Sequence, residues 1–321
     1  MEKRSLIFVA GHRGLVGSAI VRELKKNGYD NLLLKTSSEL ELRNQAAVRD
    51  FFEKEKPEFV VLAAARVGGI GANSRFRAQM IYDNLMIQSN VIDSAHKAGV
   101  KKLLFLGSSC IYPKMAQQPM KEDALLTSEL EYTNEPYAIA KIAGLKMCEA
   151  YNLNYGTDFI SVMPTNLYGE NDSFDLENGH VLPVLIRKFH EAKKRGDKSV
   201  KLWGTGRPMR EFLHVDDLAK ASIMLLEKVS FKDLYDDEEK ETRNTHINVG
   251  TGVDVTVAQL AELIKEVVRF EGDVKWNSDM PDGTPRKLLD ITKIKELGWE
   301  PKIGLKEGIK SVYSWYQHTY E

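Results

Sequence analysis

The chain has 321 residues, with 45 Lys and Arg against 46 Asp and Glu. A net charge of −1 argues against a protein that mainly binds nucleic acid or an anionic membrane, since both favour a basic excess. The two cysteines, Cys110 and Cys148, form no CxxC pair, so we expect neither a disulfide scaffold nor a structural metal site. No apolar run approaches the length of a membrane span or a signal peptide core. We therefore expect a soluble cytoplasmic protein.

The first half of the chain alternates two hydrophobic patterns. Continuous apolar runs, typical of strands buried on both faces of a sheet, occupy residues 6–10, 32–34, 59–62, 103–106 and 159–163. Helical periodicity occupies residues 15–26, 45–54, 78–98 and 137–155. This alternation predicts right-handed crossovers and an α/β fold with a Rossmann-type, doubly wound parallel sheet.

The pattern becomes irregular after Pro164, where short helical and strand patterns mix. We expect residues 1–165 to form a Rossmann domain, with some later segments returning to it. Residues 166–321 should form mainly a smaller, mixed α/β substrate lobe. The acidic stretch at residues 233–241 is most simply a solvated loop.

A glycine-rich loop separates the first expected strand from the first expected helix. It consists of Gly11, His12, Arg13, Gly14, Leu15, Val16 and Gly17. Glycines permit a tight turn and close backbone approach, and the helix N-terminus offers free N–H groups to a pyrophosphate. The GxxGxxG spacing resembles that of extended short-chain dehydrogenase/reductase proteins. The loop therefore predicts dinucleotide binding.

Charge after the second strand indicates which dinucleotide is bound. NAD sites usually place an acid there to bind the adenosine ribose, whereas this chain has Lys35 and Thr36. Arg13 adds a second cation in the glycine loop. A 2′-phosphate would find partners here, which favours NADP(H), although Lys35 and Arg13 could also be simply solvated.

Ser108, Tyr137 and Lys141 form the first catalytic candidate. Tyr137 is the only one of the twelve tyrosines with a lysine four residues later, and this spacing puts both side chains on one helix face. A nearby lysine cation favours the phenolate, and a serine hydroxyl can hold a carbonyl oxygen. This set suits proton transfer coupled to hydride transfer at a carbonyl.

Cys110 lies two residues after Ser108. A lone cysteine is usually a small core residue, but beside a carbonyl site its thiol can remove a proton alpha to a ketone. Such a base works best with an acid on the opposite face of the sugar. His180, at the start of a helix-like stretch, is the candidate acid, although a single histidine could be a cap or a surface residue.

Six segments together resemble the GDP-L-fucose synthase family, whose members are 3,5-epimerase/4-reductases of the extended short-chain dehydrogenase/reductase group. They span residues 11–17, 107–113, 134–141, 163–169, 210–217 and 281–287. The Ser-Ser-Cys-Ile-Tyr-Pro segment is the most specific of them. The resemblance implies an NADP-dependent oxidoreductase that is also an epimerase.

The resemblance also implies roles for individual residues. Cys110 and His180 would be base and acid in the epimerisation, and Tyr137 would donate a proton while Ser108 binds the carbonyl oxygen and Lys141 holds the nicotinamide ribose. Besides the glycine loop, Lys35 and Thr36, the implied cofactor contacts are Leu106, Gly107, Ser108, Ser109, Lys141, Pro164, Thr165, Asn166, Leu167 and His180. The implied GDP-sugar contacts are Lys188, Trp203, Arg210, Asp282 and Lys287. Family members commonly carry arginine near Lys35 and at Lys188, and lysine keeps the charge but loses the bidentate fork.

Other functions fit less well. A nucleotide-sugar 4,6-dehydratase needs a carboxylate pair beside the catalytic serine, and there is no Asp or Glu between Gly107 and Tyr112. A simple 4-epimerase would usually retain the acidic ribose ligand. Another nucleotide-sugar 4-reductase/epimerase and a non-catalytic NADP-binding protein remain alternatives. The resemblance further suggests a homodimer, with the helices at 78–98 and 137–155 as interface elements.

Overall fold

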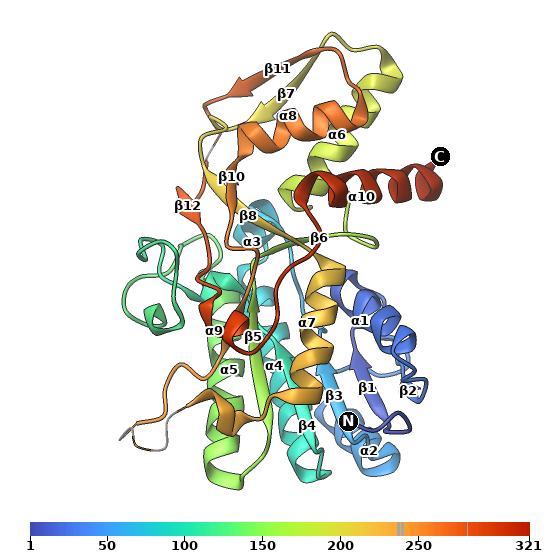
Figure 1. Ribbon diagram of the computed structural model, residues 1–321, viewed down its shortest axis with the longest axis vertical. Helices are drawn as coiled ribbons and strands as arrows, with labels where there is room; N and C mark the ends of the chain where they lie inside the picture. Colours follow the sequence, from blue (N-terminus) through green and yellow to red (C-terminus); the bar gives the residue numbers. More distant parts are fainter. Residues whose placement is uncertain (236–237, 239–240, 281) are drawn as a thin grey trace.

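The computed structural model of the chain describes residues 1–235, 238, 241–280 and 282–321. Its larger part is built around one parallel sheet, and a smaller part lies beyond the carboxyl ends of these strands (Figure 1). In spatial order the strands are β2 (Leu32–Leu33), β1 (Ile7–Ala10), β3 (Phe59–Leu62), β4 (Lys102–Leu106), β5 (Phe159–Pro164) and β9 (Ile247–Val249). All neighbours pair in parallel, which confirms the expected α/β class.

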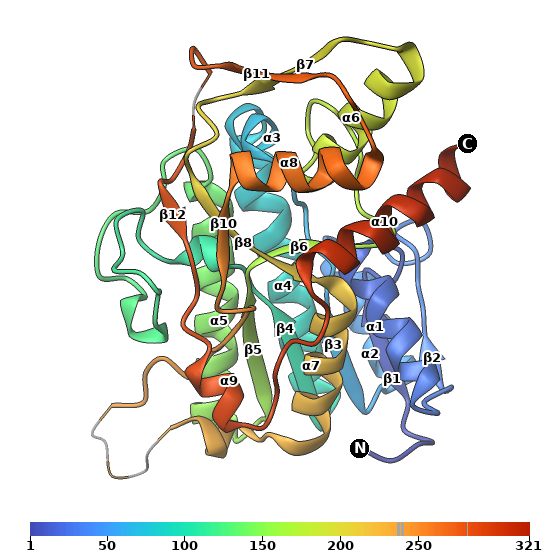
Figure 2. The same cartoon turned by 45° about the horizontal axis from the view of Figure 1, so that its top comes forward.

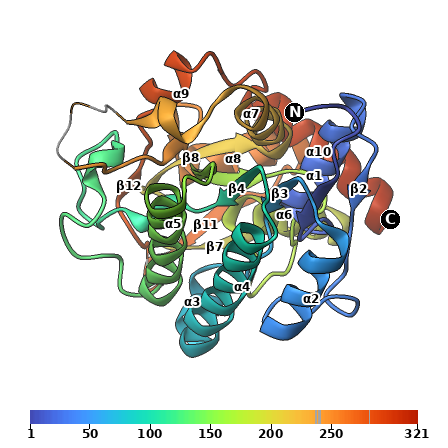
Figure 3. The ribbon, with the colours of Figure 1, turned by 90° about the horizontal axis from the view of Figure 1, so that it is seen from below.

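Helices cover both faces of this sheet (Figure 3). One face carries α2 (Gln45–Glu55), α4 (Arg77–Lys97) and α5 (Glu135–Tyr155), and the other carries α1 (Leu15–Lys26) and α7 (Val215–Lys228). Because the chain winds from β1 to β2 and then back across β1 to β3, the direction of winding reverses between β1 and β3. Ligands of such sheets bind at the carboxyl ends of the strands beside this switch point.

The smaller part combines a mixed sheet with helices packed against it (Figure 2). Its central strand β8 (Met209–His214) pairs in parallel with β6 (Asn166–Tyr168) and β12 (Arg286–Lys287) and antiparallel with β10 (Asp254–Thr256). A second, two-stranded sheet joins β7 (Ser199–Trp203) to β11 (Asp273–Asn277). The helices are α6 (Val181–Arg195), α8 (Val257–Val268) and α10 (Leu305–Tyr320), while the short α9 (Thr292–Glu296) lies against β9.

Two separate hydrophobic clusters form the core. One contains the buried side chains of β1, β3, β4 and β5, together with those of α7 and β9 from the later half of the chain. The other joins α6, α8 and α10 beneath β7 and β8. Within the residues that the structure describes, no helix is long and apolar enough to cross a membrane.

The structure adjusts several expected boundaries. The strand expected at 32–34 contains only Leu32–Leu33, and the helix expected at 137–155 begins at Glu135. Pro136 occupies the first turn of that helix, where its missing N–H is not needed. The short helix α3 (Ile70–Arg75) was not expected. Residues 236, 237, 239 and 240 of the acidic stretch lie outside the described residues.

Candidate active site

The glycine-rich loop between β1 and α1 has the geometry that a dinucleotide requires. Gly11 has φ of +83°, and a Cβ there would lie 2.7 Å from the backbone nitrogen of Ala64. A Cβ at Gly17 would lie 2.1 Å from the Gly11 carbonyl oxygen. Gly14 caps α1 without a side-chain hydrogen bond, so the N–H groups of the first turn are open to an anion. Two further loop residues are half-buried against the larger core: Leu15 and Val16.

The two cations expected to bind a 2′-phosphate, Lys35 and Arg13, both act on the carboxylate of Glu39. Thr36 donates to Glu39 Oε2 from its backbone nitrogen at 2.8 Å and from its hydroxyl at 2.6 Å. These hydrogen bonds, helped by the charges of Lys35 and Arg13, lower the pKa of Glu39. Burial and the Arg13 charge lower the pKa of His12. The sequence interpretation missed Glu39, although Thr-x-x-Glu is a recognisable capping spacing.

Helix α5 brings Tyr137 and Lys141 to the end of β4. The Lys141 ammonium donates to the Leu106 carbonyl oxygen at 2.7 Å and lies 5.8 Å from the centre of the Tyr137 ring. Burial lowers the pKa of Lys141 to about 8. Burial also raises the pKa of Tyr137, and a hydrogen bond with Ser108 only partly offsets this effect. The surroundings therefore favour the protonated phenol, whereas the sequence had suggested a phenolate stabilised by lysine.

The thiol of Cys110 belongs to the same cluster. Ser108 precedes a short 3-10 helix, Ser109–Ile111, and its hydroxyl accepts from the Cys110 backbone nitrogen at 3.3 Å. Burial raises the pKa of the thiol, while the charge of Lys287, a hydrogen bond with Ser108 and the charge of Lys141 lower it. The thiol is thus buried, and the charges of Lys287 and Lys141 favour its anion.

Backbone packing fixes the loop that carries Ser108. Gly107 donates to the Val162 carbonyl oxygen at 2.8 Å, and a Cβ at Gly107 would lie 2.3 Å from the Met163 sulfur. A side chain at Gly107 would therefore require the Met163 side chain to move. Ser109 is buried directly behind the loop.

His180 reaches the same region from the other part of the molecule. It is the N-cap residue of α6 but makes no capping hydrogen bond, so its imidazole is not needed by the helix. The imidazole is exposed, yet the protein surrounds it closely enough that burial, helped by the Lys287 charge, lowers its pKa. The charge of Lys287 therefore lowers the pKa of both Cys110, the expected base, and His180, the expected acid.

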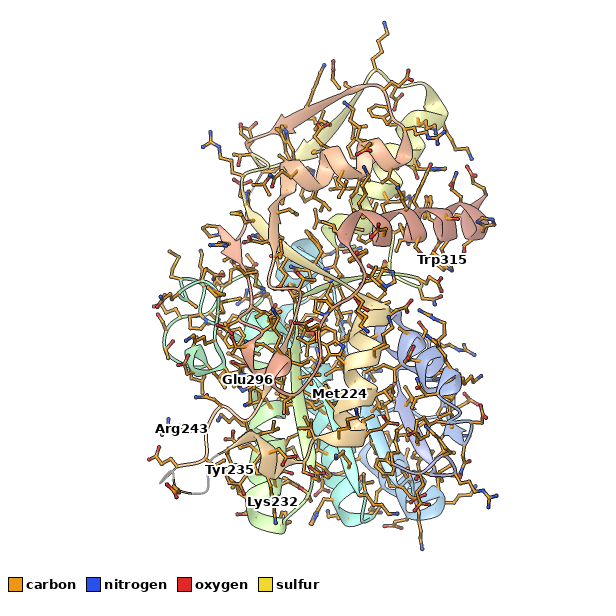
Figure 4. All side chains as sticks on the ribbon, viewed as in Figure 1. Met224, Lys232, Tyr235, Arg243, Glu296 and Trp315 are labelled. Atoms are coloured by element: carbon orange, nitrogen blue, oxygen red, sulfur yellow. The ribbon has the colours of Figure 1, made fainter. Side chains whose placement is uncertain are left out.

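The loop before His180 is anchored to the C-terminal helix. The Phe174 ring stacks on Trp315 with centroids 6.2 Å apart and lies 4.6 Å from the Tyr316 ring. Figure 4 shows Trp315 on α10, on the side of the smaller part away from α9. The C-terminal helix thus supports the segment that delivers His180.

The turn expected to border the nicotinamide joins the two parts of the molecule. Thr165 and Asn166 both donate to the Glu211 carbonyl oxygen, at 3.3 and 2.7 Å. Pro164 ends β5, and Leu167 continues in β6. The buried carboxylate of Glu211 accepts from the backbone nitrogens of Gly252 at 2.7 Å and Leu289 at 3.0 Å. The sequence interpretation gave Glu211 no role, because only its long-range partners reveal one.

The five residues implied for GDP-sugar binding fall into two connected groups. Lys188 lies 5.9 Å from the centre of the Trp203 ring. Arg210 pairs in register with Lys287 and donates to the Asp282 carbonyl oxygen at 3.4 Å. The Asp282 carboxylate accepts from the Thr205 backbone and hydroxyl, both at 2.7 Å, so it binds the loop that follows Trp203. Asp282 thus connects the group of Lys188 and Trp203 with the group of Arg210 and Lys287.

Comparisons with known proteins identify the family of this chain. Residues 7–250 match the model of the NAD dependent epimerase/dehydratase family. GDP-L-fucose synthase 1 of Arabidopsis thaliana is 58% identical over 98% of this chain and 94% of its own length. GDP-L-fucose synthase of Escherichia coli (strain K12) is 55% identical over 97% of this chain and 96% of its own. A GDP-mannoheptose C4 reductase from Campylobacter jejuni, solved with NADP bound, is 45% identical with a TM-score of 0.90, over 99% of both chains. The chain therefore belongs to the NAD dependent epimerase/dehydratase family.

Proposed function

We propose that this chain converts GDP-4-dehydro-6-deoxy-D-mannose to GDP-L-fucose by epimerisation at C3 and C5 followed by NADPH-dependent reduction at C4. One observation carries this proposal. The Cys110 thiol lies in the same buried cluster as Ser108, Tyr137 and Lys141. A base for the hydrogens next to a ketone therefore shares one site with the Ser108 and Tyr137 hydroxyls, which can bind the ketone oxygen. The high identity to GDP-L-fucose synthases of plants and bacteria supports the same reaction.

Epimerisation uses the acidity of hydrogens next to the C4 ketone. The Cys110 thiolate removes the hydrogen from C3 or C5, and the electron pair moves onto the C4 oxygen as an enolate. Ser108 and Tyr137 hold that oxygen by hydrogen bonds. His180 then returns a proton to the opposite face of the same carbon, which inverts it. Lys287 assists because its positive charge stabilises the thiolate and favours release of the proton from His180.

Reduction follows at the same carbonyl. NADPH, when bound, supplies the hydride to C4. Tyr137 donates its phenolic proton to the C4 oxygen, which suits a residue whose environment favours the protonated form. Ser108 keeps the oxygen in place, and Lys141, with its pKa lowered to about 8, is a ready proton source to restore the tyrosine.

The remaining residues bind the two nucleotides. The fit of the glycine loop to a pyrophosphate rests on Gly11 and Gly17, where no side chain could be accommodated, and Arg13 and Lys35 would hold the 2′-phosphate. The cations Lys188, Arg210 and Lys287 would face the diphosphate of the GDP-sugar, because charged donors bind such oxygens most strongly. Trp203, which is 55% exposed, offers a free ring face to the guanine or the sugar.

A substrate assay tests the proposal. Purified protein is mixed with GDP-4-dehydro-6-deoxy-D-mannose and NADPH, with NADH in parallel, and cofactor oxidation and product are followed. NADPH oxidation that yields GDP-L-fucose supports the proposal. The second candidate, suggested by the Campylobacter reductase, is simple C4 reduction of a different GDP-keto-sugar. That reading predicts an unepimerised product, or turnover only with another GDP-4-keto-sugar.

We further propose a cytoplasmic homodimer. Helices α4 and α5 pack along one another and leave apolar side chains on their outer surface, including Tyr82, 62% exposed, and Ile139, 42% exposed. Two such helix pairs would cover each other in a symmetric interface. Light scattering should give about twice the monomer mass, whereas a monomer mass at all concentrations would contradict the proposal.

A further inference from the structure

We infer that the connection between β3 and α3, residues 63–69, is a positioning element that sets His180 relative to the cofactor loop, with Gly69 as its contact residue. The inference rests on the proposed function, in which His180 is the acid of the epimerisation. It concerns residues that touch neither nucleotide in that proposal.

The first end of this connection packs against the glycine-rich loop. Ala63 donates to the Ala10 carbonyl oxygen at 3.1 Å. A Cβ at Gly11 would lie 2.7 Å from the Ala64 nitrogen and 2.8 Å from its Cα. The two backbones are therefore in direct contact, and the connection starts at a position fixed by the cofactor loop.

Two buried asparagines hold the middle of the connection. Asn84 accepts from the Arg66 backbone nitrogen and donates to the Arg66 carbonyl oxygen, both at 2.9 Å. Asn73 donates to the carbonyl oxygens of Gly68 at 2.6 Å and Gly69 at 3.1 Å. Both asparagines are at most 7% exposed. Since buried hydrogen bonds of this kind are costly to break, the segment behaves as a fixed spacer and not as a free loop.

The other end contacts the residues directly before His180. Gly69 donates to the Asn178 carbonyl oxygen at 2.9 Å, and a Cβ at Gly69 would lie 2.7 Å from the Gly179 carbonyl oxygen. Gly179 cannot easily retreat, because a Cβ built on it would already lie 2.5 Å from the Asp175 carbonyl oxygen. His180 follows at once and has no capping bond of its own. Its place is therefore set by the backbone that Gly69 contacts.

The variant Gly69→Ala tests this inference, with Gly71→Ala as the matched control. The Gly71 Cβ would lie 3.3 Å from the Glu177 carbonyl oxygen, a contact that a shift of a few tenths of an ångström relieves. Exchange, defined here as deuterium incorporation with inversion at C3 and C5 of GDP-4-dehydro-6-deoxy-D-mannose, is followed by NMR in D₂O with NADP⁺ bound, which cannot deliver a hydride. NADP⁺ affinity and thermal unfolding are measured on the same samples.

We expect Gly69→Ala to lower the maximal exchange rate about 10- to 100-fold, as misplacement of a catalytic group by about 1 Å does. The KM, the NADP⁺ affinity and the melting temperature should stay near wild type, and Gly71→Ala should exchange normally. Exchange at the wild-type rate, or loss of NADP⁺ binding in parallel with exchange, overturns the inference. If the wild-type protein itself shows no exchange, the proposed function fails instead.

A second variant covers the case in which Gly69→Ala does not fold. Asn73→Ala removes both hydrogen bonds to the Gly68 and Gly69 carbonyls without adding a clash. The expected result has the same direction, with slower exchange and unchanged NADP⁺ affinity. Unchanged exchange in this variant would also overturn the inference.

Discussion

Replacing Lys141 by methionine should stabilise the folded protein, because it removes a buried charge, and should remove the activity. Lys141 is 3% exposed, and burial lowers its pKa from 10.5 to about 8. One pKa unit corresponds to about 1.4 kcal/mol, so keeping this ammonium charged costs the folded state about 3 kcal/mol below pH 8. Methionine has a similar length and no charge.

One lost hydrogen bond opposes that gain. The Leu106 carbonyl oxygen, which accepts from Lys141 at 2.7 Å, would lose its partner at a cost of about 1–3 kcal/mol. The net change at neutral pH should therefore lie between about zero and 2 kcal/mol in favour of Lys141→Met. Activity should fall about 100- to 10,000-fold, the usual contribution of an acid–base group.

The pH dependence provides the sharper test. The unfolded chain binds the lysine proton up to about pH 10, whereas the folded chain releases it near pH 8. The unfolded state thus binds more protons in this window, and wild-type stability should gain about 3 kcal/mol from this group as the pH rises through it. Urea unfolding at pH 7.5 and pH 10 measures this gain, which Lys141→Met should lack. An identical pH dependence in both proteins would refute the reasoning.

Four further substitutions test the framework of the site. Gly17→Ala places a Cβ 2.1 Å from the Gly11 carbonyl oxygen and should abolish NADPH binding and lower the melting temperature. Gly14→Ala, with no atom nearer than 3.6 Å, should leave the melting temperature unchanged. Lys35→Ala should weaken NADPH binding about twofold to fivefold without changing NADH binding, and equal weakening of both would argue against a 2′-phosphate contact. Glu211→Gln should cost about 1–3 kcal/mol of unfolding free energy, and an unaltered urea midpoint would show that its backbone contacts contribute little.

Much of the parallel sheet could be predicted from the sequence because its strands are buried on both faces. The run at residues 6–10 contains β1, and every residue of β1 is buried, so local hydrophobicity suffices there. The mixed sheet around β8 gave no such signal. Its strand β12 contains only Arg286 and Lys287, so its pairing with β8 depends on contacts that no local pattern encodes.

The candidate site also combines residues that the local sequence predicts with residues that only the fold brings together. Tyr137 and Lys141 were recognisable because one helix turn relates them, and Ser108 and Cys110 because they follow one strand. His180 was named only as a candidate acid, and Lys287 only as a GDP-sugar contact implied by the resemblance. The effect of Lys287 on Cys110 was not predicted, because the two residues lie 177 positions apart in the chain. Glu39 was missed although the Thr-x-x-Glu spacing indicates its contacts with Thr36.

One site is proposed to perform both epimerisation and reduction, and the product made by the Cys110→Ser variant distinguishes this from a site that performs reduction alone. The variant is incubated with GDP-4-dehydro-6-deoxy-D-mannose and NADPH, and the product's stereochemistry is determined by NMR. We expect continued, slower NADPH oxidation to a GDP-6-deoxyhexose that is not inverted at C3 or C5, because the base is absent while Ser108, Tyr137 and Lys141 remain. Formation of GDP-L-fucose at the wild-type rate would contradict it.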